Sequence, residues 1–302
     1  MKRYEKFVIE VEMGITIKIS EGTNGELVIS TKNSVNPPIP EGYKHVCGEW
    51  NNGLVIERYS DRSQFVWIPV KSLDNNGTLD GEHFSEKFGR RNFKNDKVSN
   101  SDFCEPLNDE FLEQIESVKK YGGFYISRYQ ISKTSKGKPQ SVKGVLPWRM
   151  LYFDEAKEVA ATFEDSEDVK SHLPFGAEYD SVLEWFIKTK IKTRDEIEED
   201  STEWGNYATY TRAELRQRRW GHACEKILET GSREEWSANN IYDLSGNGQE
   251  WTQEKCRTGI IIDDYPVVRG GNERCPYVTN RECESDIYRE DNIVFRVALY
   301  IK

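Results

Sequence analysis

The fold is limited most by a long segment without helical or strand periodicity, residues 192–292. Gly, Asn, Asp and Ser recur through it, and aromatic residues occur singly between them. Loops of such length without secondary structure are uncommon in compact domains and are usually functional. We therefore expect long loops that aromatic side chains anchor, with most regular structure in the preceding part of the chain.

Regular structure is predicted mainly before residue 192. Alternating apolar and polar residues predict short strands near residues 6–12, 15–20, 27–30, 54–58, 65–70 and 124–132. Helical spacing of apolar residues predicts helices over 108–122, 152–164 and 176–189. The first helix has Asn108 or Asp109 as its N-cap and ends at Gly122. A polar stretch over 71–100 is predicted as loop, and a closing strand over 293–302.

The prolines Pro37, Pro38 and Pro40 divide the chain, because proline cannot continue a hydrogen-bonded strand ladder. We expect residues 1–36 to form a short β unit that serves as an attachment or oligomerisation segment. Residues 37–302 are expected to form one α+β domain with two or three helices.

The charge balance limits the partners. Lys and Arg total 42 against 52 Asp and Glu, so the net charge is −10. General affinity for nucleic acid or for an anionic membrane surface is therefore not expected. No apolar run reaches membrane-spanning length, and the first residues lack the continuous apolar block of a signal peptide. We expect cytoplasmic synthesis, no membrane insertion and a partner that is neutral, cationic or locally recognised.

The six cysteines are spread thinly and include no CxxC pair, which gives little support for structural zinc. Cys47, Cys104, Cys224 and Cys256 are expected to be reduced structural thiols. Cys275 and Cys283 lie close in sequence, and a disulfide between them is sterically conceivable. Synthesis in the cytosol argues against that bond.

Several motifs follow one another in a characteristic order. They are FVWIPV, GGFYISRYQIS, VLPWRMLYFDEAKEVA, HLPFGAEYDSVLEW, WGNY, NNIYDLSGNGQEWT, VVRGG and FRVALYIK. In this order they resemble the formylglycine-generating enzyme family, also called sulfatase-modifying factor domains, over nearly the whole chain. The resemblance implies a C-type-lectin-like fold with a small twisted antiparallel sheet, packed helices and long ordered loops. It is tighter to members from Firmicutes and their prophages, and it extends to the variable ligand-binding proteins of diversity-generating retroelements.

The resemblance also implies a calcium site in DLSGNGQE. Carried over by position, Asp243 and Glu250 supply side-chain ligands, and Gly246 and Gly248 supply carbonyl oxygens. Calcium binds six to eight such hard oxygens. The alternative is a Gly/Asn turn whose acids face water. In either case Trp251, which follows the turn, is expected to anchor the loop on the core.

Catalytic members of the family bind Cu(I) through a cysteine pair after RGG. Cys275 matches the first position, whereas Asn280 occupies the second and Cys283 comes three residues later. Two-coordinate copper requires both thiolates to converge on one point. Cys275 and Cys283 are therefore the catalytic residues only under the alternative of a copper-dependent oxidase that converts a peptidyl cysteine to formylglycine.

The same segment carries a mixture of Tyr, Arg and short polar residues that is typical of recognition surfaces. The candidate ligand-binding residues are Asn272, Glu273, Arg274, Tyr277, Thr279, Asn280, Arg281 and Tyr288. The bland alternative is a solvated loop without a partner.

The function expected from these observations is a non-catalytic ligand- or receptor-binding protein, a surface component of a phage or prophage particle. Its partner would be a protein or glycan receptor on a cell surface, with other particle proteins held through residues 1–36. The alternatives are the copper oxidase and a structural decoration protein without a ligand.

Overall fold

The structure is a computed structural model that describes residues 8–11, 15–21, 27–33, 37–49, 52–70, 93–94, 101–164, 166–208, 211, 213–214, 226–258, 264–272, 274–287 and 289–302. The chain is α+β, with few helices and mainly antiparallel sheets, as the sequence predicts. Most of the stretch predicted as loop, 71–100, lies outside the described residues.

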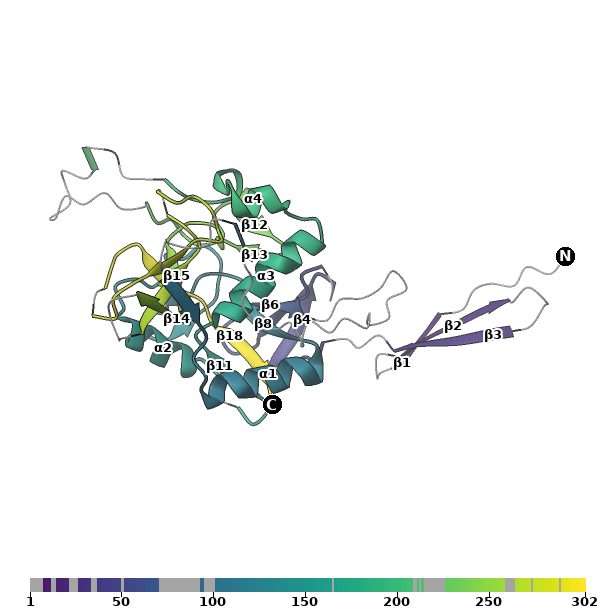
Figure 1. Cartoon of the computed structure of the whole chain (residues 1–302). Helices are drawn as coiled ribbons and strands as arrows, with labels where there is room; N and C mark the ends of the chain where they lie inside the picture. Colours follow the sequence, from purple (N-terminus) through teal and green to yellow (C-terminus); the bar gives the residue numbers. More distant parts are fainter. Residues whose placement is uncertain are drawn as a thin grey trace.

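A six-stranded antiparallel sheet forms the centre of the molecule (Figure 1). Its strand order is β11 (Val169–His172), β18 (Ala298–Ile301), β8 (Gly123–Ser127), β6 (Gln64–Pro69), β5 (Val55–Arg58) and β4 (Tyr43–Cys47). Successive residues of a strand point to opposite faces, and both faces of this sheet are covered. In β6, Val66 and Ile68 belong to one hydrophobic cluster, and Phe65 and Trp67 belong to another.

Helices cover both faces of this sheet. On the face of Val66, the cluster includes Phe111 and Val118 from α1 (Asp109–Tyr121) and Leu183 and Phe186 from α3 (Gly176–Lys188). On the face of Phe65, it includes residues of α2 (Phe153–Ala161). A short helix, α4 (Arg194–Glu198), and two 3-10 turns, Thr202–Trp204 and Glu234–Trp236, follow in the region predicted to be irregular.

The predicted ends of the first helix are confirmed. The Asn108 Oδ1 atom accepts a hydrogen bond from the Phe111 backbone N–H at 2.9 Å. Gly122 ends the helix with φ 82°, in the left-handed region that glycine adopts without a steric penalty.

A second sheet packs on the face that carries Phe65. Its order is β16 (Arg281–Cys283), β15 (Tyr265–Arg269), β14 (Gln249–Thr258) and β17 (Ile293–Phe295), and β7 (Ser101–Cys104) also pairs with β14. The β14–β17 pair is parallel, and the other pairs are antiparallel. The expectation that residues 192–292 lack regular structure is therefore wrong at β14, which is the central strand of this sheet. Two two-stranded ladders complete the domain: β9 (Ser132–Lys133) with β10 (Pro139–Gln140), and β12 (Ser237–Ala238) with β13 (Ile241–Tyr242).

The closing strand predicted over 293–302 is two strands in different sheets. β17 pairs with β14, whereas β18 pairs with β8 and β11. Arg296 and Val297 connect them, and the Arg296 side chain is fully buried with its guanidinium donating to the backbone carbonyl of Ser127. Apolar alternation alone does not reveal this change of sheet.

Near the amino terminus, β1 (Val8–Val11), β2 (Ile15–Glu21) and β3 (Leu27–Asn33) form a separate antiparallel sheet. Figure 1 shows this sheet standing apart from the rest of the fold. The division of the chain at residue 36 stays a prediction. Within the described ranges, no helix is long and apolar enough to cross a membrane.

Candidate binding site

Four fully buried charged side chains contact one another between helix α3 and the second sheet. Arg269 of β15 and Arg281 of β16 lie opposite each other in the strand register. Arg269 donates to Asp180 Oδ1 at 2.7 Å and to Glu254 Oε2 at 3.1 Å. Arg281 donates to Asp180 Oδ2 and, at 3.0 Å, to Glu254 Oε1. We call these four residues the charge cluster.

The charge cluster is neutral overall, which makes its burial tolerable. Burial alone would lower the pKa of Arg269, but the carboxylates of Asp180 and Glu254 raise it above its ordinary value. Asp180 comes from α3 and Glu254 from β14, so the cluster joins a helix to the second sheet. Removal of one partner from such a buried set leaves an uncompensated charge.

The recognition loop, residues 270–280, connects the two arginines of the charge cluster. Gly271 has φ 76°, and a Cβ at this position would lie 2.6 Å from the Cys275 carbonyl oxygen. The Asn272 Oδ1 atom accepts hydrogen bonds from the backbone N–H groups of Arg274 at 2.9 Å and Cys275 at 3.0 Å. The loop therefore has its own turn structure as well as two fixed ends.

The predicted ligand-binding residues divide into two groups. Arg274 is exposed, and Asn272 and Tyr277 are half-buried, so these three lie at the surface. Thr279, Asn280 and Arg281 are buried, and Arg281 belongs to the charge cluster. The expected display of these three side chains is therefore corrected. Glu273 and Tyr288 lie outside the described residues.

The cysteines differ from the sequence expectation. Cys256 and Cys283 form a disulfide with their Cα atoms 5.7 Å apart, linking β14 to β16. The prediction that Cys256 is reduced, and the idea of a Cys275–Cys283 bond, are both wrong in this structure. Cys275 has no disulfide partner and is half-buried. The pKa of Tyr277 is raised above its ordinary value, mainly by a side-chain hydrogen bond with Cys275 and to a smaller extent by burial.

The two acids of the DLSGNGQE segment are buried, so the alternative of a turn with water-facing acids is wrong. The Asp243 Oδ2 atom accepts hydrogen bonds from Thr230 Oγ1 at 2.8 Å and the Gly231 N–H at 2.7 Å. Burial is the main cause that raises the pKa of Asp243. Trp251 is buried against Phe153, which confirms its anchoring role.

The guanidinium of Arg296 organises the other end of this segment. It donates to Glu250 Oε1 at 2.8 Å and to the carbonyl oxygen of Tyr242. Gln130 Nε2 donates to Glu250 Oε1 at 3.1 Å and to the Asp243 carbonyl oxygen at 3.1 Å. Burial raises the pKa of Glu250 to about 7 against the opposing effect of Arg296.

The calcium ligands expected from the sequence have hydrogen-bond partners within the protein. Glu250 already accepts from a cation and an amide, and the Gly246 carbonyl oxygen accepts from Gln130 at 3.5 Å. Asp243 Oδ1 is buried without a hydrogen-bond partner, but Asp243 Oδ2 is engaged. The contacts of these oxygen atoms fit a loop held by Arg296 and Gln130 better than a loop that wraps a calcium ion. Calcium binding by Asp243, Gly246, Gly248 and Glu250 stays a prediction.

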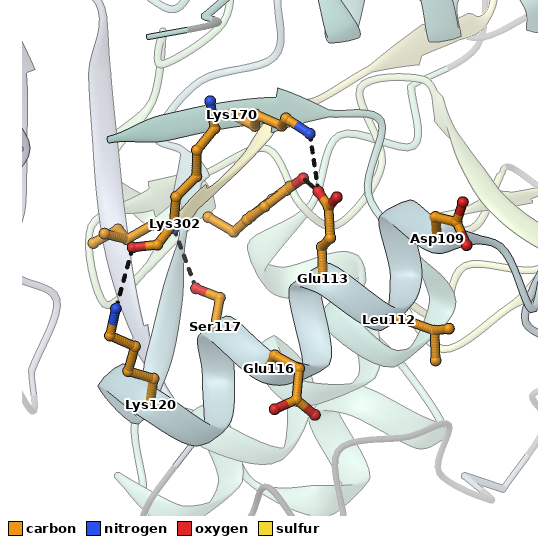
Figure 2. A pocket seen from close by; sticks show the side chains of 10 residues that line it. Asp109, Leu112, Glu113, Glu116, Ser117, Lys120, Lys170 and Lys302 are labelled. Atoms are coloured by element: carbon orange, nitrogen blue, oxygen red, sulfur yellow. Dashed lines mark hydrogen bonds and ion pairs between the residues drawn. The ribbon is translucent and has the colours of Figure 1, made fainter. Parts of the chain in front are cut away.

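A surface hollow of about 700 Å³ lies between α1 and the carboxyl-terminal end of the chain (Figure 2). The Lys170 ammonium group contacts Glu113 Oε2 at 2.9 Å, and the Tyr300 hydroxyl donates to the same carboxylate. The Lys120 Nζ atom lies 3.5 Å from the Lys302 carbonyl oxygen. The hollow was not predicted, because its lining comes from α1, β11 and β18, which are far apart in sequence. Glu113 and Lys170 of this lining form an ion pair, and Glu116 pairs with Lys119 of the same helix.

A scan against models of known protein families finds no match, and a search among curated proteins finds none either. Among solved structures, the chain is similar to the crystal structure of CarF, with a TM-score of 0.40 and 13% identity, over 60% of this chain and 87% of CarF. It is also similar to Treponema denticola variable protein 1, with a TM-score of 0.28 and 17% identity, over 98% of this chain and 99% of that protein. Both likenesses are too distant to assign a family or an activity.

Proposed function

We propose that the chain is a non-catalytic binding protein that uses the recognition loop, residues 270–280, as its ligand surface. The observation that carries this proposal is the pairing of a surface loop with a buried charge cluster at both of its ends. Arg269 and Arg281 fix the ends, while Arg274 and Tyr277 reach the surface between them. A loop that is already ordered loses less conformational entropy on binding.

The accessible groups of the loop suit a polar ligand. Arg274 supplies a guanidinium that can form two parallel hydrogen bonds, and Tyr277 supplies a flat amphipathic contact. A protein or glycan receptor on a cell surface is the ligand class that we propose. The proposal includes a C-type-lectin-like core related to formylglycine-generating enzymes, and a location on a phage or prophage particle.

The copper oxidase is less well supported. Cu(I) coordination by a cysteine pair needs two thiolates, and the sulfur of Cys283 is bonded to Cys256. Only Cys275 of the proposed pair keeps a thiol. The charge cluster supports the binding role instead, because it fixes both ends of the recognition loop.

The proposal is tested by applying the purified chain to a printed glycan array and to intact Firmicute cells. In parallel, the chain is incubated with a cysteine-containing sulfatase peptide, copper and oxygen. We expect selective retention on glycans or cells and no loss of mass from the peptide. Conversion of the peptide to formylglycine, or no retention on any array position or cell, would contradict the proposed function.

A further inference from the structure

A buried serine outside the recognition loop contacts the middle of that loop. Ser201 lies between α4 and the 3-10 turn Thr202–Trp204 and is fully buried. Its backbone N–H donates a hydrogen bond to the Pro276 carbonyl oxygen at 2.9 Å. Its Oγ atom accepts a hydrogen bond from the Val278 backbone N–H at 3.0 Å. Ser201 therefore holds the loop backbone on both sides of Tyr277, which reaches the surface.

The hydroxyl of Ser201 has a fixed orientation. It donates to the Glu196 carbonyl oxygen at 2.7 Å. A hydroxyl has one hydrogen to donate and two lone pairs that accept, so the Ser201 oxygen acts as an acceptor toward Val278. Trp204, a residue of the hydrophobic core, donates its backbone N–H to the Ser201 carbonyl oxygen at 3.3 Å and its indole N–H to the Glu196 carbonyl oxygen at 3.1 Å. Ser201 is therefore held in place by residues that do not belong to the loop.

A second contact from the same part of the chain holds the start of the loop. The Tyr207 hydroxyl donates to the Gly270 carbonyl oxygen at 3.1 Å, and its oxygen lies 2.7 Å from Ser245 Oγ. Residues 201–207 thus contact the recognition loop at its start and at its middle, whereas the charge cluster holds the strands on either side of it.

We infer that Ser201 is a positioning residue of the ligand surface, because it fixes the direction in which Tyr277 meets a ligand. The inference rests on the proposed function of the recognition loop. The charge cluster acts at Arg269 and Arg281, and a loop restrained only at its ends keeps conformational freedom that binding must remove. The contact of Ser201 with the middle of the loop removes part of that freedom before a ligand binds.

The order of the loop is tested without a ligand, through the rate at which iodoacetamide alkylates Cys275 in the native protein. The Cys275 thiol is half-buried, lies outside the disulfide and forms a hydrogen bond with the Tyr277 side chain. Ser201→Ala keeps the N–H that donates to Pro276 but removes the oxygen that accepts from Val278. Alkylation of Cys275 should become about five-fold faster or more, because the loop opens more often.

Ser171→Ala is the matched control. Ser171 of β11 is also buried, and its hydroxyl donates to the Ala160 carbonyl oxygen at 2.7 Å and accepts from the Glu164 N–H at 2.8 Å. The control therefore loses the same two kinds of hydrogen bond away from the loop, and Cys275 should react at the wild-type rate. Equal alkylation rates in the two variants would overturn the inference.

A measurement on the wild type guards against loss of folding in Ser201→Ala. Hydrogen exchange at the Val278 N–H should be slow, because this group donates to a fully buried oxygen. Exchange as fast as in an unfolded peptide would overturn the inference without any variant.

The effect on binding is measured by titrating both variants against a glycan or Firmicute cell preparation that retains the wild type. Ser201→Ala should bind about five-fold more weakly or worse, whereas Ser171→Ala should bind as the wild type does. Equal binding by Ser201→Ala and the wild type, or equal loss in both variants, would overturn the positioning role. Retention of the wild type on no preparation would instead overturn the proposed function, and the alkylation rates would then show whether Ser201 orders the loop.

Discussion

Arg269 and Arg281 donate to the same two buried carboxylates, one from helix α3 and one from strand β14. The pair holds the two strands that flank the recognition loop. Because both guanidinium groups are fully buried, their contacts are shielded from solvent screening. The geometry of the loop therefore depends on residues that are buried from solvent.

Loss of one member of the charge cluster should destabilise the whole domain. Arg281→Ala leaves Asp180 and Glu254 with one cation, and breaking such a buried set costs about 3–5 kcal/mol. The measurement is urea unfolding followed by tryptophan fluorescence. Arg274→Ala is the control, because an exposed arginine away from the cluster should change stability by less than about 0.5 kcal/mol. Similar unfolding midpoints for the two variants would mean that the cluster does not support the domain.

The titration of His172 should lower the free energy of unfolding as the pH rises. The His172 Nε2 atom lies 2.8 Å from Glu178 Oε2, and both side chains are buried. Burial opposes the charged imidazolium, but Glu178 raises the pKa of His172 above its ordinary value of 6.5. The imidazolium–carboxylate pair therefore stabilises the fold fully below pH 6.5, and that contribution is lost as the pH rises through the higher pKa of the folded state.

The check is the free energy of unfolding between pH 5.5 and 8.5 for the wild type and for His172→Gln, about one unit below and two units above the ordinary histidine pKa. The difference between the two proteins should shrink as the pH rises. A difference that is constant over this range would show that His172 does not become charged in the folded protein.

The DLSGNGQE segment should be stable without calcium. Arg296 and Gln130 already donate hydrogen bonds to the Glu250 carboxylate. We therefore expect the melting curves with calcium chloride and with a chelator to coincide. Arg296→Met should lower the melting temperature strongly, since it leaves Glu250 buried without its cation. A marked rise in melting temperature with calcium, abolished in Asp243→Ala, would instead support the calcium site.

The Cys256–Cys283 disulfide should be found by peptide mapping of unreduced protein, with Cys275 alkylated in the same sample. Cys283→Ser should lower stability by about 2–4 kcal/mol, the usual range for a native cross-link. Cys275→Ser is the matched control and should have little effect. Alkylation of Cys256 and Cys283 without reduction would contradict this pairing.

The sequence predicts the parts of the fold that local patterns determine. Asn108 and Gly122 mark the ends of α1 because capping depends on a few neighbouring residues. The sequence does not predict the central strand β14, because glycines precede it and its own polar residues hide a strand that pairs with neighbours on both sides.

The candidate site was predictable only in part, for a related reason. Arg281 was assigned to the surface because its partners Asp180 and Glu254 lie 101 and 27 residues away in the chain. A local signal did exist: α3 carries Glu178 and Asp180 close to a run of apolar residues, and acids that such a helix buries need partners. The surface positions Asn272, Arg274 and Tyr277 follow from loop composition alone.

The most direct test of the account is a binding titration of Arg274→Ala/Tyr277→Ala against a glycan or cell preparation that retains the wild type. Both side chains reach the surface of the recognition loop and neither belongs to the charge cluster. We expect at least ~30-fold weaker binding, about 2 kcal/mol, with an unchanged melting temperature. A control double variant, Tyr59→Ala/Arg233→Ala, alters exposed residues of the same types on other elements and should bind as the wild type does. Unchanged binding by the loop variant, or equal loss in both variants, would contradict the assignment of residues 270–280 as the ligand surface.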